Sequence, residues 1–216
     1  MNRDIPFYQY LTDEQKDMLD RSIQQVSYKK GQMVHRHGEA CVGIIFVRKG
    51  RLSFFALSEE GREITILRAK AGQTCVLSAS CVFQAVETES HIVAEVPTEV
   101  AVLPAPILAQ LMHQNKDVER VVYQRASAQF AGALNTLQRI VFFSLEKRLA
   151  CFLRDEKKYQ TGPVFQATHE QIARHIGSSR EVVTRMLKQF ADKGIVALGR
   201  GTVTVLDYDE LEDLTY

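Results

Sequence analysis

The stretch from Thr168 to Phe190 constrains the fold of this chain more than any other. Its sequence, THEQIARHIGSSREVVTRMLKQF, divides into two short amphipathic helices separated by Gly177. The first helix should begin at Thr168, because Thr-x-x-Gln is a capping box, and should end at Gly177 in a left-handed turn. The second should begin at Ser178, where Ser-x-x-Glu repeats the box. Two helices joined in this way predict a helix-turn-helix, whose second helix enters the DNA major groove.

The second helix has one apolar face and one charged face. From the charges alone, an ordinary helical hairpin with a solvated face is an equally good interpretation. A β-hairpin pattern follows, because the β-prone runs 195–198 and 202–206 are joined by Gly199-Arg200-Gly201. This addition favours a winged helix. The expected apolar face consists of Val182, Val183, Met186, Leu187 and Phe190.

Composition fits a soluble globular protein of 216 residues with a net charge of +1, but the charge is unevenly distributed. Residues 164–206 hold six Lys or Arg against three acids, and the last ten residues hold five acids and no base. A modest basic face beside an acidic tail fits reversible DNA binding.

The start of the chain, MNRDIPFYQY, has no apolar core of a signal peptide, and the longest apolar run, 42–47, is too short to cross a bilayer. We therefore expect a cytoplasmic protein without a membrane partner. In that compartment cysteines are expected as thiols rather than structural disulfides. The cysteines are Cys41, Cys75, Cys81 and Cys151.

The N-terminal half reads as many short strands. After a capping box at Thr12 that opens a short helix, β-prone runs separated by glycine-containing turns extend from residue 26 to 103. This pattern predicts a double-stranded β-helix, or jelly-roll, barrel and an α+β protein overall. The clearest predicted strands are 43–47, 52–57, 63–67 and 92–96.

Residues 115–145 form one long helix-compatible segment with apolar residues on two sides. Such a helix is buried on two sides, either within one subunit or between two. The predicted domains are a β-barrel (1–114), a long helix (115–145) and a winged helix-turn-helix (146–216). A hinge is expected near residues 142–145.

The turns of the barrel resemble a known family. Lys30-Gly31, Gly38-Glu39, Lys49-Gly50 and Glu60-Gly61-Arg62-Glu63 match the cyclic-nucleotide-binding-type barrel of Crp/Fnr transcriptional regulators, and the winged helix extends the resemblance over nearly the whole chain. The resemblance implies that the barrel, 1–114, is an effector-sensing domain and that 115–145 is a dimerisation helix. It also implies a homodimer that binds double-stranded DNA and has RNA polymerase as a partner.

The nucleotide-binding cassette of that family is altered here. Val76-Leu77 stands where a ribose-binding Gly-Glu pair is expected, and Thr88-Glu89 stands where an Arg-Ser pair would hold the cyclic phosphate. Without that cation, and with Glu89 placed to repel phosphate, cAMP is not expected as the effector. No cofactor is expected, and the effector stays unknown.

The cysteine- and serine-rich segment 75–81 replaces the cassette. Four interpretations stay open: a redox-sensing thiol pair, a metal or haem site with His91 nearby, a pocket for a small organic ligand, or buried cysteines of the core. Cys41 and Cys151 are interpreted as core residues. The effector-pocket candidates are Cys75, Ser78, Ser80, Cys81, Thr88 and Glu89.

A cupin-like metal- or thiol-dependent enzyme with an accessory DNA-binding-like domain is the alternative. It would use His35, His37 and Glu39, whose spacing is shorter than in metal-binding cupins. No catalytic residue and no metal ligand is therefore assigned, and the chain is expected not to be an enzyme.

The DNA-reading residues are assigned from the second helix. Arg180, Glu181 and Arg185 at its positions 1, 2 and 6 are the expected base contacts, because Arg donates to guanine and Glu accepts from cytosine. The same triplet in Crp-like regulators reads a TGTGA-type half-site. Val182 and His169 depart from the family residues. Expected backbone contacts are His169, Ser179, Lys188 and Arg200.

Overall fold

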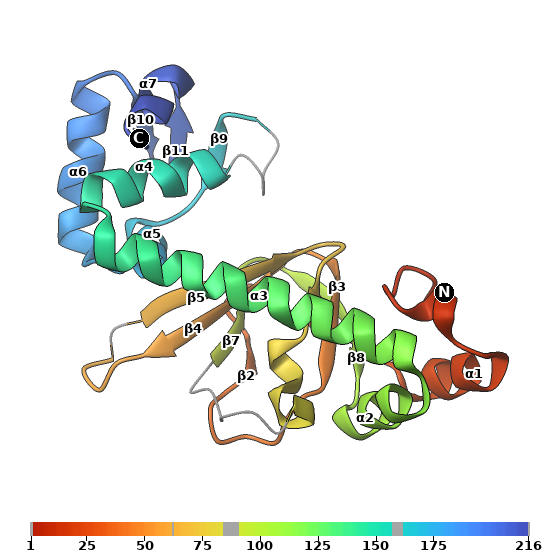
Figure 1. Cartoon of the computed structure of the whole chain (residues 1–216). Helices are drawn as coiled ribbons and strands as arrows, with labels where there is room; N and C mark the ends of the chain where they lie inside the picture. Colours follow the sequence, from red (N-terminus) through yellow and green to blue (C-terminus); the bar gives the residue numbers. More distant parts are fainter. Residues whose placement is uncertain (1, 62, 84–90, 157–161, 216) are drawn as a thin grey trace. The chain divides into compact units, whose positions relative to one another are not determined.

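The computed structural model describes residues 2–61, 63–83, 91–156 and 162–215 (Figure 1). The chain forms two compact units, Met1–Ala56 with Leu67–Leu134 and Leu57–Ile66 with Asn135–Tyr216. Within the described ranges, no helix combines the length and the apolar content needed to cross a membrane.

Two four-stranded sheets form the N-terminal part of the chain, in the orders β1-β8-β3-β6 and β2-β7-β4-β5. β8 pairs antiparallel with β1 and β3, and β7 pairs antiparallel with β2 and β4. Strands that are neighbours in a sheet are mostly distant in sequence, which confirms the predicted jelly roll. The strands are β1 (Gln24–Tyr28), β2 (Met33–His35), β3 (Ile44–Lys49), β4 (Arg51–Leu57), β5 (Glu63–Lys70), β6 (Thr74–Cys75), β7 (His91–Ala94) and β8 (Thr98–Leu103).

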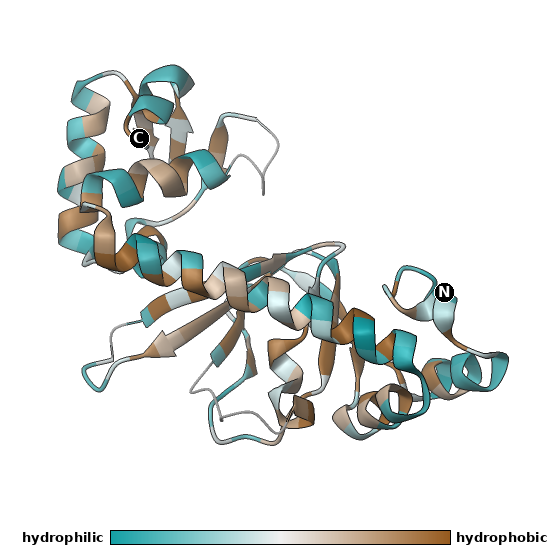
Figure 2. Cartoon of the chain, in the orientation of Figure 1, coloured by the Kyte–Doolittle hydropathy of each residue, from teal (hydrophilic) through white to brown (hydrophobic). Residues whose placement is uncertain are grey.

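Residues 44–47 of β3 are all buried, because both faces of the sheet that contains β3 are covered. Ile45 and Val47 lie in the core between the sheets, in one cluster with Phe54 of β4. Ile44 points the other way, into a second cluster that the neighbouring helices complete. Burial of each such side chain contributes about 1.5–3 kcal/mol. Figure 2 shows hydrophobic colour on the strands of the sheets and on the helices beside them.

A glycine closes the turn between β3 and β4. Gly50 has a φ of 85°, and a Cβ at this position would collide with the backbone of Pro97. Glycine is the residue that meets both requirements without strain.

Helices cover the outer face of the first sheet. The capping box at Thr12 is present, with Gln15 donating and accepting as predicted. The side chain of Asn115 accepts from the backbone N–H groups of Asp117 and Val118, which fixes the start of the long helix. These elements are η1 (Tyr8–Tyr10), α1 (Asp13–Ser22), η2 (Leu77–Phe83), α2 (Ala105–Gln114) and α3 (Lys116–Phe142).

The C-terminal part is a helix-turn-helix followed by a hairpin, as predicted. Its three-stranded sheet has the order β10-β11-β9, and one apolar cluster joins this sheet to the helices. The sequence did not indicate the third strand, β9. The elements are α4 (Leu145–Glu156), β9 (Val164–Gln166), α5 (His169–Ile176), α6 (Arg180–Asp192), β10 (Val196–Gly199), β11 (Thr202–Val205) and α7 (Tyr208–Asp213).

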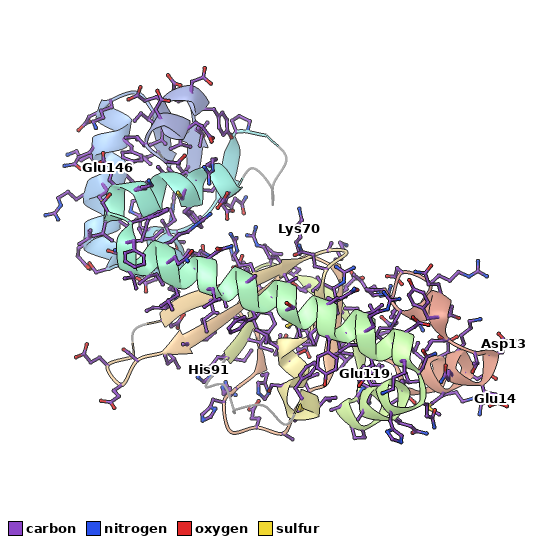
Figure 3. All side chains as sticks on the ribbon, in the orientation of Figure 1. Asp13, Glu14, Lys70, His91, Glu119 and Glu146 are labelled. Atoms are coloured by element: carbon purple, nitrogen blue, oxygen red, sulfur yellow. A yellow bond between two sulfur atoms is a disulfide. The ribbon has the colours of Figure 1, made fainter. Side chains whose placement is uncertain are left out.

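Polar contacts brace the second unit. The Arg148 guanidinium donates to the Ile176 carbonyl over 2.8 Å, which satisfies the C-terminal end of α5. Arg139 pairs with Asp155 over 2.8 Å. The helical path breaks between α3 and α4 at residues 143–144, inside the segment predicted as a hinge. Figure 3 labels Glu146 on α4, whose carboxylate lies 3.5 Å from the Lys193 ammonium group.

Candidate nucleic-acid interface and sensory region

The turn between α5 and α6 has the predicted geometry. Thr168 and Gln171 form the capping box at the start of α5. Gly177 adopts a left-handed conformation with a φ of 65°, and the Ser178 N–H donates to the Ala173 carbonyl over 2.9 Å. These bonds satisfy the end of α5 and turn the chain into α6.

The start of α6 differs from the prediction by one residue. Because the N–H of Ser178 completes the α5 cap, the next residue, Ser179, has the extended conformation of an N-cap and its hydroxyl accepts from the Val182 N–H. The predicted Ser178–Glu181 box is therefore wrong. Glu181 is the second residue of α6, where its own backbone N–H and then the Ser179 hydroxyl hold the pKa of its carboxylate below the ordinary value.

The two faces of α6 are sharply different. Val183, Met186, Leu187 and Phe190 are buried in the core of the unit, whereas Val182 is only half-buried. The opposite face exposes Arg180, Glu181, Arg185 and Lys188. Within the described part of the chain, Arg180, Arg185 and Lys188 form no ion pair, whereas Arg174 on α5 pairs with Glu63 over 3.0 Å. Their charges therefore stay available to an anionic partner.

His169 is joined to α6 by a chain of two hydrogen bonds. Its Nδ1 lies 2.8 Å from the Thr184 hydroxyl, which in turn donates to the Arg180 carbonyl over 2.8 Å. Since the hydroxyl has a single hydrogen, Nδ1 must be the donor in the first bond. The neutral ring then carries its lone pair on Nε2. Burial, followed by the nearby Arg180 charge, lowers the pKa of His169.

The wing is the hairpin of β10 and β11, with Val196 opposite Val205 and Gly199 opposite Thr202. Gly201 has a φ of 72°, which the tight turn requires. Arg200 lies at the exposed tip between the glycines. The structure thus exposes Arg180, Arg185, Lys188 and Arg200 within one unit, with His169 half-buried beside α6.

The cysteine expectations need correction. Cys41 and Cys81 form a disulfide with a Cα–Cα distance of 6.4 Å, so the chain does not hold four thiols and Cys41 is not a simple core residue. The sequence left open a thiol pair within the segment 75–81, and the structure instead pairs Cys81 with Cys41 from outside that segment. Cys75 instead points into the core between the sheets, and burial raises the pKa of its thiol to about 12. Cys151 is a buried free thiol, as predicted.

The remaining sensory candidates are only partly brought together. Ser78 is buried and its hydroxyl donates to the Cys75 carbonyl over 2.9 Å, while Ser80 is half-buried on η2. Thr88 and Glu89 lie outside the described residues. His35, His37 and Glu39 approach one another, with 3.9 Å between the His35 ring and Glu39. Among the described residues, no group of three or more potential ligands is arranged to hold a metal ion.

Gln129 of α3 was not identified from the sequence. Its side-chain oxygen accepts from the backbone N–H groups of Val76 and Leu77, and its nitrogen donates to the Thr74 carbonyl over 2.6 Å. These three bonds fasten the segment 74–77 to α3. A single glutamine within a helical repeat gives no local signal of such a role, and only its place on an otherwise apolar face could have suggested it.

α3 also exposes a continuous apolar stripe. Phe130 is 63% exposed and Leu137 is 55% exposed, whereas Val118, Val121 and Val122 at the start of the helix are buried. Figure 2 shows hydrophobic and hydrophilic segments alternating along this helix. Stripe members recur at spacings of seven, four, three and four residues, which is the heptad pattern of a coiled-coil seam. They are Tyr123, Phe130, Leu134, Leu137 and Val141.

Comparison with known proteins agrees with this architecture. Residues 25–115 match the cyclic nucleotide-binding domain, and residues 147–214 match the Crp-like helix-turn-helix domain. The crystal structure of a Crp/Fnr-family transcriptional regulator from Eubacterium rectale is 35% identical, covers 98% of both chains and has a TM-score of 0.91. The cyclic AMP receptor protein of Thermus thermophilus is 25% identical over 98% of this chain and 97% of its own. The anaerobic regulatory protein of Haemophilus influenzae is 23% identical over 98% and 83%.

A sensory domain of the nucleotide-binding type joined to a Crp-like helix-turn-helix defines a DNA-binding transcriptional regulator. This confirms the function predicted from the sequence, and the cupin-like enzyme alternative finds no support among these relatives. The chain belongs to the Crp/Fnr family.

Proposed function

We propose that two copies of this chain bind an inverted-repeat operator, each inserting α6 into the major groove. The observation that carries the proposal is the exposed face of α6, where Arg180 and Arg185 form no ion pair among the described residues. Arg180, Glu181 and Arg185 are the first, second and sixth residues of α6. Arginine matches guanine O6 and N7, and glutamate accepts from cytosine N4, so the triplet can distinguish base pairs.

Other exposed groups would hold the DNA backbone. Lys188 on α6 and Arg200 at the tip of the wing are the most direct candidates for phosphate contacts. Ser179 has a double role, because its hydroxyl caps α6 and also binds the Glu181 carboxylate. We propose that Ser179 orients Glu181 and also contacts the DNA backbone. His169 would contact phosphate through Nε2, which donates only in the protonated ring.

The exposed stripe on α3 supports the dimer. Leu134 and Leu137 are large apolar residues on the surface of a single chain, and the heptad spacing suits pairing with the same helix of a second copy. Ala133, in contrast, is half-buried outside the stripe. A dimer places its two recognition helices about one helical turn, ~34 Å, apart on a palindromic site.

Regulation would be a two-state equilibrium. We propose that occupancy or chemistry in the barrel changes the position of α3 through the segment that Gln129 fastens, and so biases DNA binding. cAMP is not proposed as the effector, because the resemblance aligns Thr88 and Glu89 with the phosphate-binding pair. The dimer would act in the cytoplasm, contact RNA polymerase at promoters as other members of the family do, and regulate rather than catalyse.

Selection of binding sites from random duplex DNA with purified full-length protein tests the proposal. We expect an inverted repeat whose half-site centres lie about 10 base pairs, or a multiple, apart. Recovery of sequences without two-fold symmetry would contradict the proposed dimeric reading mode.

A further inference from the structure

The disulfide between Cys41 and Cys81 links two segments that are 40 residues apart in the sequence. Cys41 lies just before β3 and is half-buried, whereas Cys81 lies on η2 and is exposed. The free cysteines, Cys75 and Cys151, are both buried. Cys81 is therefore the cysteine on the surface of the chain, and it is bonded to a half-buried partner.

η2 contacts the long helix at both ends. At its start, the Leu77 N–H donates to Gln129 over 3.2 Å. At its end, the ring of Phe83 lies 5.6 Å from the ring of Tyr123. Cys81 lies between these contacts, and Tyr123 is also the first member of the exposed stripe on α3. A change in how Cys81 is anchored therefore acts on the helix proposed to pair two copies.

The reduced pair has an alternative bonding arrangement. Sγ of Cys41 lies 3.4 Å from the Ser78 carbonyl oxygen, but a disulfide sulfur has no hydrogen to donate to it. A reduced Cys41 thiol would donate to that carbonyl, while the Cys81 side chain would be released to solvent. Reduction would therefore give the segment a second arrangement, in which η2 is no longer covalently tied to the segment that precedes β3.

We propose that Cys41 and Cys81 form a peroxide-sensing dithiol that controls DNA binding through η2 and α3. This inference rests on the proposed function, because it assigns the regulation of that dimer. In a compartment where thiols are normally reduced, a reversible disulfide of this kind serves sensing rather than permanent stabilisation.

The chemistry is balanced with a hydroperoxide as the oxidant. The exposed Cys81 thiolate attacks one peroxide oxygen, the O–O bond breaks, and a sulfenic acid forms while the other oxygen leaves as water or an alcohol. Cys41 then attacks the Cys81 sulfur, the S–O bond breaks, and the sulfenic oxygen leaves as water as the disulfide forms. Two thiols are oxidised by two electrons and the peroxide is reduced. A cellular dithiol reverses the step by thiol–disulfide exchange.

The test compares full-length wild type, Cys41→Ser, Cys81→Ser and the buried-cysteine control Cys75→Ala, each after dithiothreitol or hydrogen peroxide. Alkylation followed by mass spectrometry counts free thiols. Peroxide should remove two alkylatable thiols from wild type and from Cys75→Ala, but should form no internal disulfide in either serine variant. Hydrogen exchange should change at residues 123–129 between the two wild-type forms.

DNA affinity completes the test. The Kd of wild type for its selected operator should differ by at least about fivefold between the reduced and oxidised forms. Both serine variants should show one Kd under both conditions, and Cys75→Ala should respond as wild type does. Gln129→Leu should keep the thiol chemistry but reduce the difference in Kd.

The switch would be overturned if the reduced and the disulfide-bonded wild type had equal Kd values and equal hydrogen exchange, with each form verified by thiol alkylation. A full response in Cys41→Ser would also overturn it. If neither form bound any duplex DNA, the proposed function would fail instead, and the exchange at residues 123–129 would still decide whether the dithiol moves α3.

Discussion

Arg180→Ala tests the reading mode of α6 most directly. Arg180 is exposed and has no ion-pair partner among the described residues, so its removal should change the free energy of unfolding by less than about 0.5 kcal/mol. The loss should fall on DNA binding. A two-pronged contact with guanine is worth about 1–3 kcal/mol, which corresponds to an increase in Kd of about 5- to 150-fold.

The assay measures the Kd of the dimer by fluorescence anisotropy for the selected operator and for single-base variants of each half-site. Since Arg180 also lowers the pKa of His169, we would work at about pH 8, where that ring is neutral with or without Arg180. Arg180→Ala should have the same Kd for the operator and for the variant that is changed at the base pair contacted by Arg180. Lys188→Ala is the matched control. It should raise the Kd for every DNA sequence by the same factor and should reduce the slope of log Kd against log salt concentration by about one. Full base preference in Arg180→Ala would refute the assignment.

Three further predictions concern the dimer, the protonation of His169 and the effector. Leu134→Arg should weaken the dimer at least about tenfold, measured by sedimentation, since it places a charge in the stripe. The exposed control Gln138→Arg should leave the dimer intact. Equal masses for the two variants would contradict pairing through the stripe. Because phosphate stabilises the protonated ring, DNA affinity should rise as pH falls towards the lowered pKa of His169 and should level off below it, and the gain is lost as pH rises. His169→Gln should remove this component, and an unchanged profile would exclude the contact. Millimolar cAMP should alter neither the Tm nor the DNA affinity of wild type, and a shift of several degrees would restore cAMP as a candidate.

Local chemistry explains which features could be predicted. Capping boxes at Thr12 and Thr168 and the left-handed Gly177 are encoded within four residues, so the sequence locates them closely. Two adjacent serines, Ser178 and Ser179, can both cap a helix. The choice between them depends on which N–H completes the preceding turn, and this is a property of the folded backbone.

Contacts that depend on tertiary structure were beyond local reasoning. Cys41 meets Cys81 because the jelly roll brings the entry to β3 beside η2, and no spacing rule within one segment indicates this pairing. The exposed seam of α3 could have been found, since its heptad spacing is present in the sequence. Apolar residues on both sides of the helix obscured it, because the sequence alone does not show which side stays exposed in the folded chain.

The hairpin tip of residues 57–66 belongs to the same compact unit as the helix-turn-helix. Glu63 pairs with Arg174 of α5, and the Ile66 carbonyl accepts from the Thr136 hydroxyl over 2.9 Å. The part that recognises DNA is therefore discontinuous along the gene. A chimaera that exchanges only the predicted C-terminal domain, 146–216, would separate α5 from its acidic partner. Recombination within the family would preserve these contacts only if the hairpin tip were inherited with the domain it supports.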